Sequence, residues 1–300
     1  MSAGADPRKD GGPKPTRLEM PVIARAEDLR AHLAPARRRG ARIALVPTMG
    51  NLHAGHHSLL AIAREHADLV VASVFVNPTQ FGPNEDFARY PRTPDADAAG
   101  LAANGCDALF LPAVEEMYPF GAANTVRVSV PGFEMLEGAS RPGHFDGVAT
   151  VVAKLFNLVG PDVAVFGQKD WQQLLVIRRM ARDLAYPIEI IDAPTRREPD
   201  GLAMSSRNQY LDPDQRARAS TIHRTLQAMR EAIRAGKAFA DIEADAAAGL
   251  RAAGFAPDYA VVRRADDLLA PEPGGSARLI GLIAARLGST RLIDNLLLTG

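Results

Sequence analysis

The stretch VPTMGNLHAGHH, residues 46–57, decides the fold of this 300-residue chain. The residues before it, 41–46, form a short apolar run that is typical of a buried strand. The residues after it, 58–64, carry apolar side chains at helical spacing. The stretch therefore predicts a strand, a glycine-containing turn and a helix start. Such a start presents free backbone N–H groups and a partial positive charge to a phosphate.

Two histidines, His53 and His56, lie at this turn with Gly55 between them. Gly55 has no side chain, which lets a backbone approach a ligand closely. Either histidine alone would be interpreted as a solvated loop residue, whereas the pair at a strand-to-helix turn favours an anion site. The arrangement resembles the HxGH signature of the nucleotidylyltransferase superfamily, in which two histidines face the phosphates of ATP.

A second strand is predicted at 68–76, which is rich in β-branched residues and ends at Asn77 and Pro78. Strand, helix and strand at this spacing form a βαβ unit, in which the two strands are parallel. Ligands of such sheets bind beyond the carboxyl ends of the strands. The turn at 49–56 and the segment 77–81 would both lie there.

The rest of the chain continues this alternation. Helices are expected at 25–39, 95–104, 148–159 and 171–184, and strands at 107–111, 162–166, 188–191 and, as an edge strand, 125–130. Beyond residue 195 turns and helices dominate. Asp212 and Pro213 suit a helix N-cap and first position, and strands are expected at 259–262 and 278–285.

These patterns predict an α/β fold. A Rossmann-like parallel sheet with helices on both faces would span residues 19–195, where nucleotide and substrate bind. A smaller C-terminal α+β domain, residues 196–300, would close over the site. The Gly-, Pro- and charge-rich residues 1–18 are expected to form a disordered tail and not a signal peptide.

Composition narrows the function classes. The net charge is +0, which argues against a general nucleic-acid-binding surface. The single cysteine, Cys106, excludes an internal disulfide and suits a reducing cytosol. Apolar runs are too short to span a bilayer. A cytoplasmic protein is therefore expected, with small-molecule partners and neither nucleic acid nor membrane.

Two more loops carry candidate phosphate ligands. Lys169 follows a predicted strand and precedes a helix, where it can deliver a point charge to phosphate. The segment MSSR at 204–207 combines hydroxyl and guanidinium donors, which suit a polyphosphate. Gln80 and Gln173 are neutral amides suited to the hydroxyl and carboxylate groups of a small polar substrate. Lys169 and the segment 204–207, each taken alone, are as common in a solvated loop or a capping turn, and a single glutamine is more often a surface residue.

Several longer motifs occur in a fixed order: PTMG at 47–50, HAGH at 53–56, NPTQF at 77–81, LEG at 136–138, RPGHFDGV at 141–148, FGQKD at 166–170 and REPDGLAMSSRN at 197–208. Together they resemble the pantoate–β-alanine ligase family over residues 20–295. The departures are small. Trp171 stands where tyrosine or phenylalanine is usual, His57 adds a histidine beside HxGH, and the N-terminal tail is an extension.

The resemblance implies a two-step, ATP-dependent and AMP-forming ligation that makes an amide bond. Pantoate would first form pantoyl adenylate and release pyrophosphate. The amine of β-alanine would then displace AMP and give pantothenate. The resemblance also implies a homodimer and Mg²⁺ accompanying ATP, held largely by phosphate and water, with no protein ligand specified.

The resemblance also implies residue roles. Catalytic roles fall to His53, His56, Lys169, Ser205, Ser206 and Arg207. ATP would be bound by the same six residues together with Met49, Gly50, Gly55, Gly167, Gln168, Asp170, Arg196 and Met204. Gln80 and Gln173 would bind pantoate or β-alanine.

Two alternatives stay open at this point. Another HxGH nucleotidylyltransferase would join a nucleotide to a phosphate acceptor, for which additional basic residues are expected where this chain has glutamines. A non-catalytic nucleotide-binding module would be favoured by loss of His56, Lys169 or Arg207, and all three are present.

Overall fold

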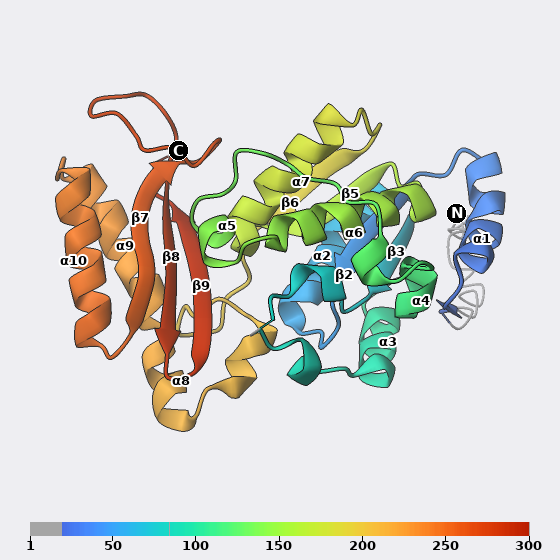
Figure 1. Cartoon of the computed structure of the whole chain (residues 1–300), viewed down its shortest axis with the longest axis horizontal. Coiled ribbons are helices and arrows are strands. Elements are labelled where there is room, and N and C mark those ends of the chain that lie inside the picture. Colours follow the sequence, from blue (N-terminus) through green and yellow to red (C-terminus); the bar gives the residue numbers. More distant parts are fainter. Residues whose placement is uncertain (1–19, 84, 300) are drawn as a thin grey trace, which may run out of the picture.

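Two sheets of different kinds make up the protein (Figure 1). The structure, a computed structural model, describes residues 20–83 and 85–299, so the tail expected at 1–18 lies outside the described residues. The first sheet has six strands in the order β1-β4-β3-β2-β5-β6, and the second has three in the order β7-β8-β9. This confirms the predicted fold class, while the domain boundary after residue 195 stays a prediction.

The large sheet is parallel throughout. Side chains of β2 alternate between two buried clusters: Ile43 and Leu45 enter one, Ala44 and Val46 the other. This period-2 burial on both faces is typical of a parallel sheet covered by helices. The strands are β1 (Val22–Ile23), β2 (Ile43–Thr48), β3 (Leu69–Val74), β4 (Ala108–Phe110), β5 (Val163–Gly167) and β6 (Glu189–Ala193).

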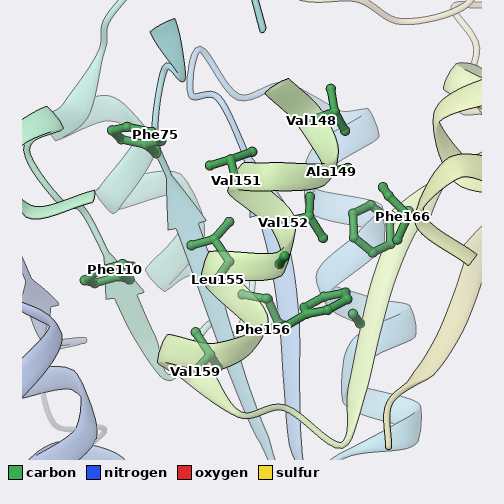
Figure 2. Close-up of a cluster of buried hydrophobic side chains, with 14 of the residues drawn as sticks. Phe75, Phe110, Val148, Ala149, Val151, Val152, Leu155, Phe156, Val159 and Phe166 are labelled. Carbon is green, nitrogen blue, oxygen red and sulfur yellow. The ribbon is translucent and has the colours of Figure 1, made fainter. Parts of the chain in front are cut away.

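Helices cover both faces of this sheet. One cluster holds buried residues of α1 (Ala26–Arg38), α6 (His144–Val159) and α7 (Trp171–Asp183), and the other holds those of α2 (Ala54–His66) and α3 (Pro94–Ala103). Figure 2 shows how α6 directs its apolar side chains toward the strands, where Phe75, Phe110 and Phe166 lie. Short helices α4 (Val114–Met117) and α5 (Glu137–Ser140) lie between α3 and α6 in the chain.

The C-terminal unit packs helices on one face of the antiparallel sheet. It contains α8 (Pro213–Ala219), α9 (Thr221–Arg234), α10 (Phe239–Ala252), β7 (Ala256–Arg264), β8 (Leu279–Leu287) and β9 (Thr290–Leu297). The predicted N-cap of α8 is confirmed, because the Asp212 side chain accepts a hydrogen bond from the backbone N–H of Gln215 at 2.8 Å.

Trp171 joins the two units. Ile280 and Leu282 of β8 turn toward it and away from α9 and α10. Its indole Nε1 donates a hydrogen bond to the carbonyl of Ala265 at 2.8 Å. The tryptophan that departs from the usual aromatic residue is therefore buried and fully partnered at the junction of the units.

The prediction of an edge strand at 125–130 was wrong, because the structure has no strand in this segment. The backbone N–H of Val128 donates to the Thr150 hydroxyl of α6 at 2.9 Å, so this segment lies over a helix. Strands β1 and β9 were not predicted: β1 has two residues, and β9 carries several polar side chains. Among residues 20–83 and 85–299, every helix lacks the length or the apolar character needed to cross a membrane.

Candidate active site

A cavity of about 240 Å³ lies at the carboxyl ends of β2 and β5. It is the place that the βαβ argument predicts for a ligand. Its walls include Met49, His53, Gly55, His56, Gln80, Gly167, Lys169, Asp170, Gln173, Arg196, Met204, Ser205, Ser206 and Arg207. The structure thus brings together the site residues predicted from the sequence, with the exceptions of Gly50 and Gln168, which do not line the cavity.

The histidine turn is a reciprocal cap. The backbone N–H of Gly55 donates to His53 Nδ1 at 3.1 Å, and the backbone N–H of His53 donates to His56 Nδ1 at 3.3 Å. The two rings are 4.1 Å apart between centroids. A Cβ at Gly55 would stand 2.8 Å from the His53 ring, so only glycine lets that ring fold back on the turn.

These hydrogen bonds determine which nitrogen of each neutral ring carries the proton. Each Nδ1 accepts a backbone N–H, so a neutral ring carries its proton on Nε2 and can donate it. Burial, followed by the charge of Lys169, lowers the pKa of His53 to about 4. Burial, followed by the neighbouring histidines His53 and His57, lowers the pKa of His56 to about 3. Near neutral pH both histidines are therefore uncharged donors.

Asp97 holds the loop that precedes these histidines. This buried carboxylate of α3 accepts the backbone N–H groups of Asn51 at 3.0 Å and Leu52 at 2.8 Å. Gly50 has a φ of +85°, and a Cβ there would stand 2.9 Å from the Asp97 carboxylate. Gly50 therefore allows the loop to pack against Asp97 and does not itself line the cavity. Sequence reasoning missed Asp97, since an acidic residue in a first helical turn is ordinary.

Lys169 faces the cavity from the turn after β5. Its side chain is 20% exposed, and its Nζ lies 4.0 Å from the Asp170 carboxylate. Gln168 turns elsewhere, because its Nε2 donates to Asp192 at 2.6 Å. Lys169 is thus the cation that this turn contributes to the cavity wall, whereas Gln168 pairs with Asp192 of β6.

The segment 204–207 meets the histidine turn. The Ser206 hydroxyl donates to the carbonyl of Asn51 at 3.1 Å, and Ser205 Oγ accepts the backbone N–H of Arg207. The Arg207 guanidinium pairs with both oxygens of Asp86, at 3.0 and 3.1 Å. Burial alone would lower the pKa of Arg207, but the Asp86 carboxylate raises it. Arg207 therefore reaches the cavity with its charge already compensated.

The two glutamines lie on different walls. Gln80 is buried, donates from Nε2 to Met49 Sδ at 3.1 Å and accepts from Asn77 Nδ2 at 3.0 Å. Gln173 lines the cavity from α7. Arg196 also borders the cavity but is exposed. The amides thus lie beside the histidine and lysine groups, as a second substrate next to a nucleotide would require.

The sequence predicted no role for the polar cluster of His144, Arg141 and Glu85, which contacts the backbone of Gln80. His144 Nδ1 donates to the Gln80 carbonyl at 2.8 Å, and its Nε2 accepts from Arg141 at 2.9 Å. Arg141 pairs with Glu85 through two bonds of 2.6 and 2.7 Å. Burial, followed by the Arg141 charge, lowers the pKa of His144 to about 4. The motif RPGH at 141–144 was the available signal, but it did not reveal these partners.

Carboxylates are scarce at the cavity. Asp170 is the acidic residue among those that line it. The described part of the chain has no cluster of three or more His, Cys, Asp or Glu side chains that could hold a metal ion. One carboxylate fits an ion that is carried mainly by phosphate oxygens and water.

A parallel sheet, a helix start at its carboxyl edge and two neutral histidine donors are the features of an α/β protein whose cavity suits a phosphate. Comparison with known proteins sharpens this class. The chain belongs to the pantoate–β-alanine ligase family, whose model matches residues 21–297.

Named relatives agree with this membership. The chain is 64% identical to a pantothenate synthetase of Stenotrophomonas maltophilia (strain K279a), covering 89% of this chain and 96% of that one. A crystal structure of pantothenate synthetase from Thermus thermophilus matches with a TM-score of 0.87 and 48% identity, over 94% of this chain and 100% of that one. A pantoate–β-alanine ligase from Francisella tularensis, complexed with β-γ ATP and β-alanine, matches with a TM-score of 0.77 and 33% identity, over 94% and 99%. The recognised resemblance is confirmed.

Proposed function

We propose that this chain joins pantoate and β-alanine in an ATP-dependent reaction. A carboxylate oxygen of pantoate attacks the α-phosphorus of ATP, the bond to the β-phosphate breaks, and pyrophosphate leaves. The amine of β-alanine then attacks the acyl carbon of pantoyl adenylate. AMP leaves with the electron pair of the acyl–oxygen bond, and the amine loses a proton as the amide of pantothenate forms.

The observation that carries this proposal is the shared cavity. It sets His53, His56 and Lys169, which suit phosphates, beside Gln80 and Gln173, which suit a small polar acid. Family membership supports the same substrates, and the Francisella relative is complexed with β-γ ATP and β-alanine. An acceptor site for a phosphate group, as in other HxGH nucleotidylyltransferases, would need more cationic groups where the glutamines lie.

In this proposal the residues divide the work. His53 and His56 donate Nε2–H to phosphate oxygens at the start of α2, where the helix dipole adds to their effect. Lys169 stabilises the charge that develops on the transferring phosphate. Ser205 donates to the leaving phosphates, Ser206 ties this wall to the histidine turn through its hydrogen bond to Asn51, and Arg207 orders the wall through Asp86.

The nucleotide walls complete the proposal. Met49, Gly50 and Gly55 shape the loop around ATP. Gly167, Asp170, Arg196 and Met204 line the cavity that would hold it, and Gln168 acts from outside the lining through its hydrogen bond to Asp192. Mg²⁺ would enter with ATP, and Asp170 is the carboxylate among the residues that line the cavity. Residues 196–300 supply the 204–207 wall, which supports closure of the smaller unit over an adenylate that water would hydrolyse.

We also propose a homodimer through the larger unit and a cytoplasmic location. Phe120 and Val126 are exposed apolar side chains on that unit, at 82% and 87%, which supports an interface there. Sedimentation of the wild type and of Val126→Asp tests this. A dimer that the substitution weakens supports the proposal, and a wild-type monomer rejects it.

Pantoate-dependent exchange of pyrophosphate into ATP tests the function. It should proceed without β-alanine, because adenylation precedes amide formation. Addition of β-alanine should then release AMP and form pantothenate. Exchange that requires a phosphorylated acceptor would favour the other nucleotidylyltransferases, and ATP binding without exchange would favour a non-catalytic module.

A further inference from the structure

Asn295 of β9 holds the turn that carries Lys169. Its side-chain Nδ2 donates to the carbonyl of Gln168 at 2.9 Å and to the carbonyl of Lys169 at 2.8 Å. Asn295 is 7% exposed. One amide group from the C-terminal sheet thus binds two consecutive carbonyls in the other unit, at a separation of 126 residues from Lys169.

The turn needs such a partner because it is not a continuous helix. The 3₁₀ turn Gln168–Asp170 runs into α7, but Asp170 has φ −98° and ψ 61°, outside the helical region. Carbonyls at such a break require donors from elsewhere in a buried setting. Asn295 supplies both donors with one side chain.

Asn295 is itself firmly held. Its backbone N–H donates to Asp294 Oδ1 at 2.8 Å, and its carbonyl accepts from Arg197 at 3.2 Å. Arg197 also forms two hydrogen bonds to Asp294, at 2.6 and 3.0 Å. Arg197 also donates to the carbonyl of Gly201 and forms a β-bridge with Ala203, next to the segment 204–207. This part of β9 therefore contacts the Lys169 turn directly and reaches the segment 204–207 through Arg197.

We propose that Asn295 is a positioning residue that sets the direction of Lys169. Asn295 is absent from the cavity lining and acts through the two carbonyls. The inference rests on the proposed role of Lys169 toward ATP. The C-terminal sheet thereby controls adenylation through the placement of one lysine.

A double-mutant cycle tests this inference, with pantoate-dependent pyrophosphate exchange as the readout. Asn295→Ala should lower the maximal exchange rate about tenfold while the KM for pantoate changes less than about twofold, because a misplaced group affects the rate at the reacting phosphate. In a Lys169→Ala background the same substitution should have little further effect. Equal effects in both backgrounds would overturn the inference.

Controls separate structural damage from positioning. Leu298→Ala removes a buried side chain near the end of the same sheet and should lower Tm without lowering the rate at permissive temperature. If Asn295→Ala does not fold, Asn295→Asp keeps the shape but loses the donors, and it should show the same coupling to Lys169. A wild-type rate for a folded Asn295 variant overturns the inference alone, whereas a wild-type rate for Lys169→Ala overturns the role of Lys169.

Discussion

The two sides of the cavity are built differently. On one side, His53 and His56 are held by backbone groups no more than three residues away. On the other side, Lys169 and Arg207 depend on Asn295 and Asp86, which lie 126 and 121 residues away in the chain. The histidine side is therefore held by contacts between neighbouring residues, whereas the cation side is held by contacts between residues far apart in the chain.

This difference predicts how substitutions on each side of the cavity affect the reaction rate and the stability of the protein. The rings of His53 and His56 are in place whenever the strand, the turn and the helix start have formed. The cation side needs both units in contact, because its partners come from β9 and from the segment after β3. Substitutions on the histidine side should therefore act on the rate and the cap together, and those on the cation side mainly on the rate.

The largest effect is expected for Lys169→Ala. Loss of one preorganised donor to developing charge costs ~3–4 kcal/mol, or about two to three orders of magnitude in rate. Tm should change little, since the Lys169 side chain lies at the cavity wall and is partly exposed. Single-turnover formation of pantoyl adenylate measures this. A near-normal rate would remove the lysine from the mechanism.

His56→Ala should lower pyrophosphate exchange about a hundredfold, with His53→Ala similar in kind and smaller. It should also cost about 1 kcal/mol of stability, because the backbone N–H of His53 loses its acceptor. Exchange rate and Tm are measured side by side.

His57→Ala provides the matched control. Its buried Nε2 has no hydrogen-bond partner among the described residues, so no hydrogen bond is lost there. Exchange should stay within about twofold of wild type. If His57→Ala were as harmful as His56→Ala, or if His56→Ala lost stability and kept its rate, the histidine turn would not be the phosphate site.

Gln80→Ala should weaken pantoate more than ATP, by about 1–3 kcal/mol, because an amide that fixes a polar acid has no reason to contact the triphosphate. Asn77 keeps a second acceptor, the carbonyl of Gly147 at 3.1 Å, which limits structural damage. Calorimetric titration of each substrate decides the point. An equal loss for both substrates, or a loss for ATP alone, contradicts this role.

The pH dependence of stability gives a separate test of the histidine side. The folded pKa of His56, about 3, lies below its unfolded value near 6.5, so the unfolded chain binds a proton first as pH falls. The stability from a neutral His56 is complete above pH 6.5 and is lost progressively toward pH 3. His56→Asn should flatten this dependence by up to ~1.4 kcal/mol per pH unit. Urea unfolding at several pH values measures the slopes, and identical slopes would exclude this linkage.

Much of the fold could be predicted from local patterns. The helices around α1, α3, α6 and α7 and the inner strands of the large sheet follow from apolar periodicity, because burial on both faces leaves a continuous signal. The segment 125–130 misled because its alternating side chains lie over a helix and not beside a strand. Strand β9 was missed because it carries polar side chains that bind other parts of the molecule.

The sequence by itself determined the histidine turn, since Gly55, His53 and His56 place and cap one another within four residues. It also determined which residue types face the cavity. Only the tertiary structure decided that Asp97 anchors the loop from 45 residues away, that Asp86 compensates Arg207, and that Asn295 holds the Lys169 turn. The reason is physical: neighbouring residues meet in any copy of the turn, whereas distant partners meet only after the sheets have packed.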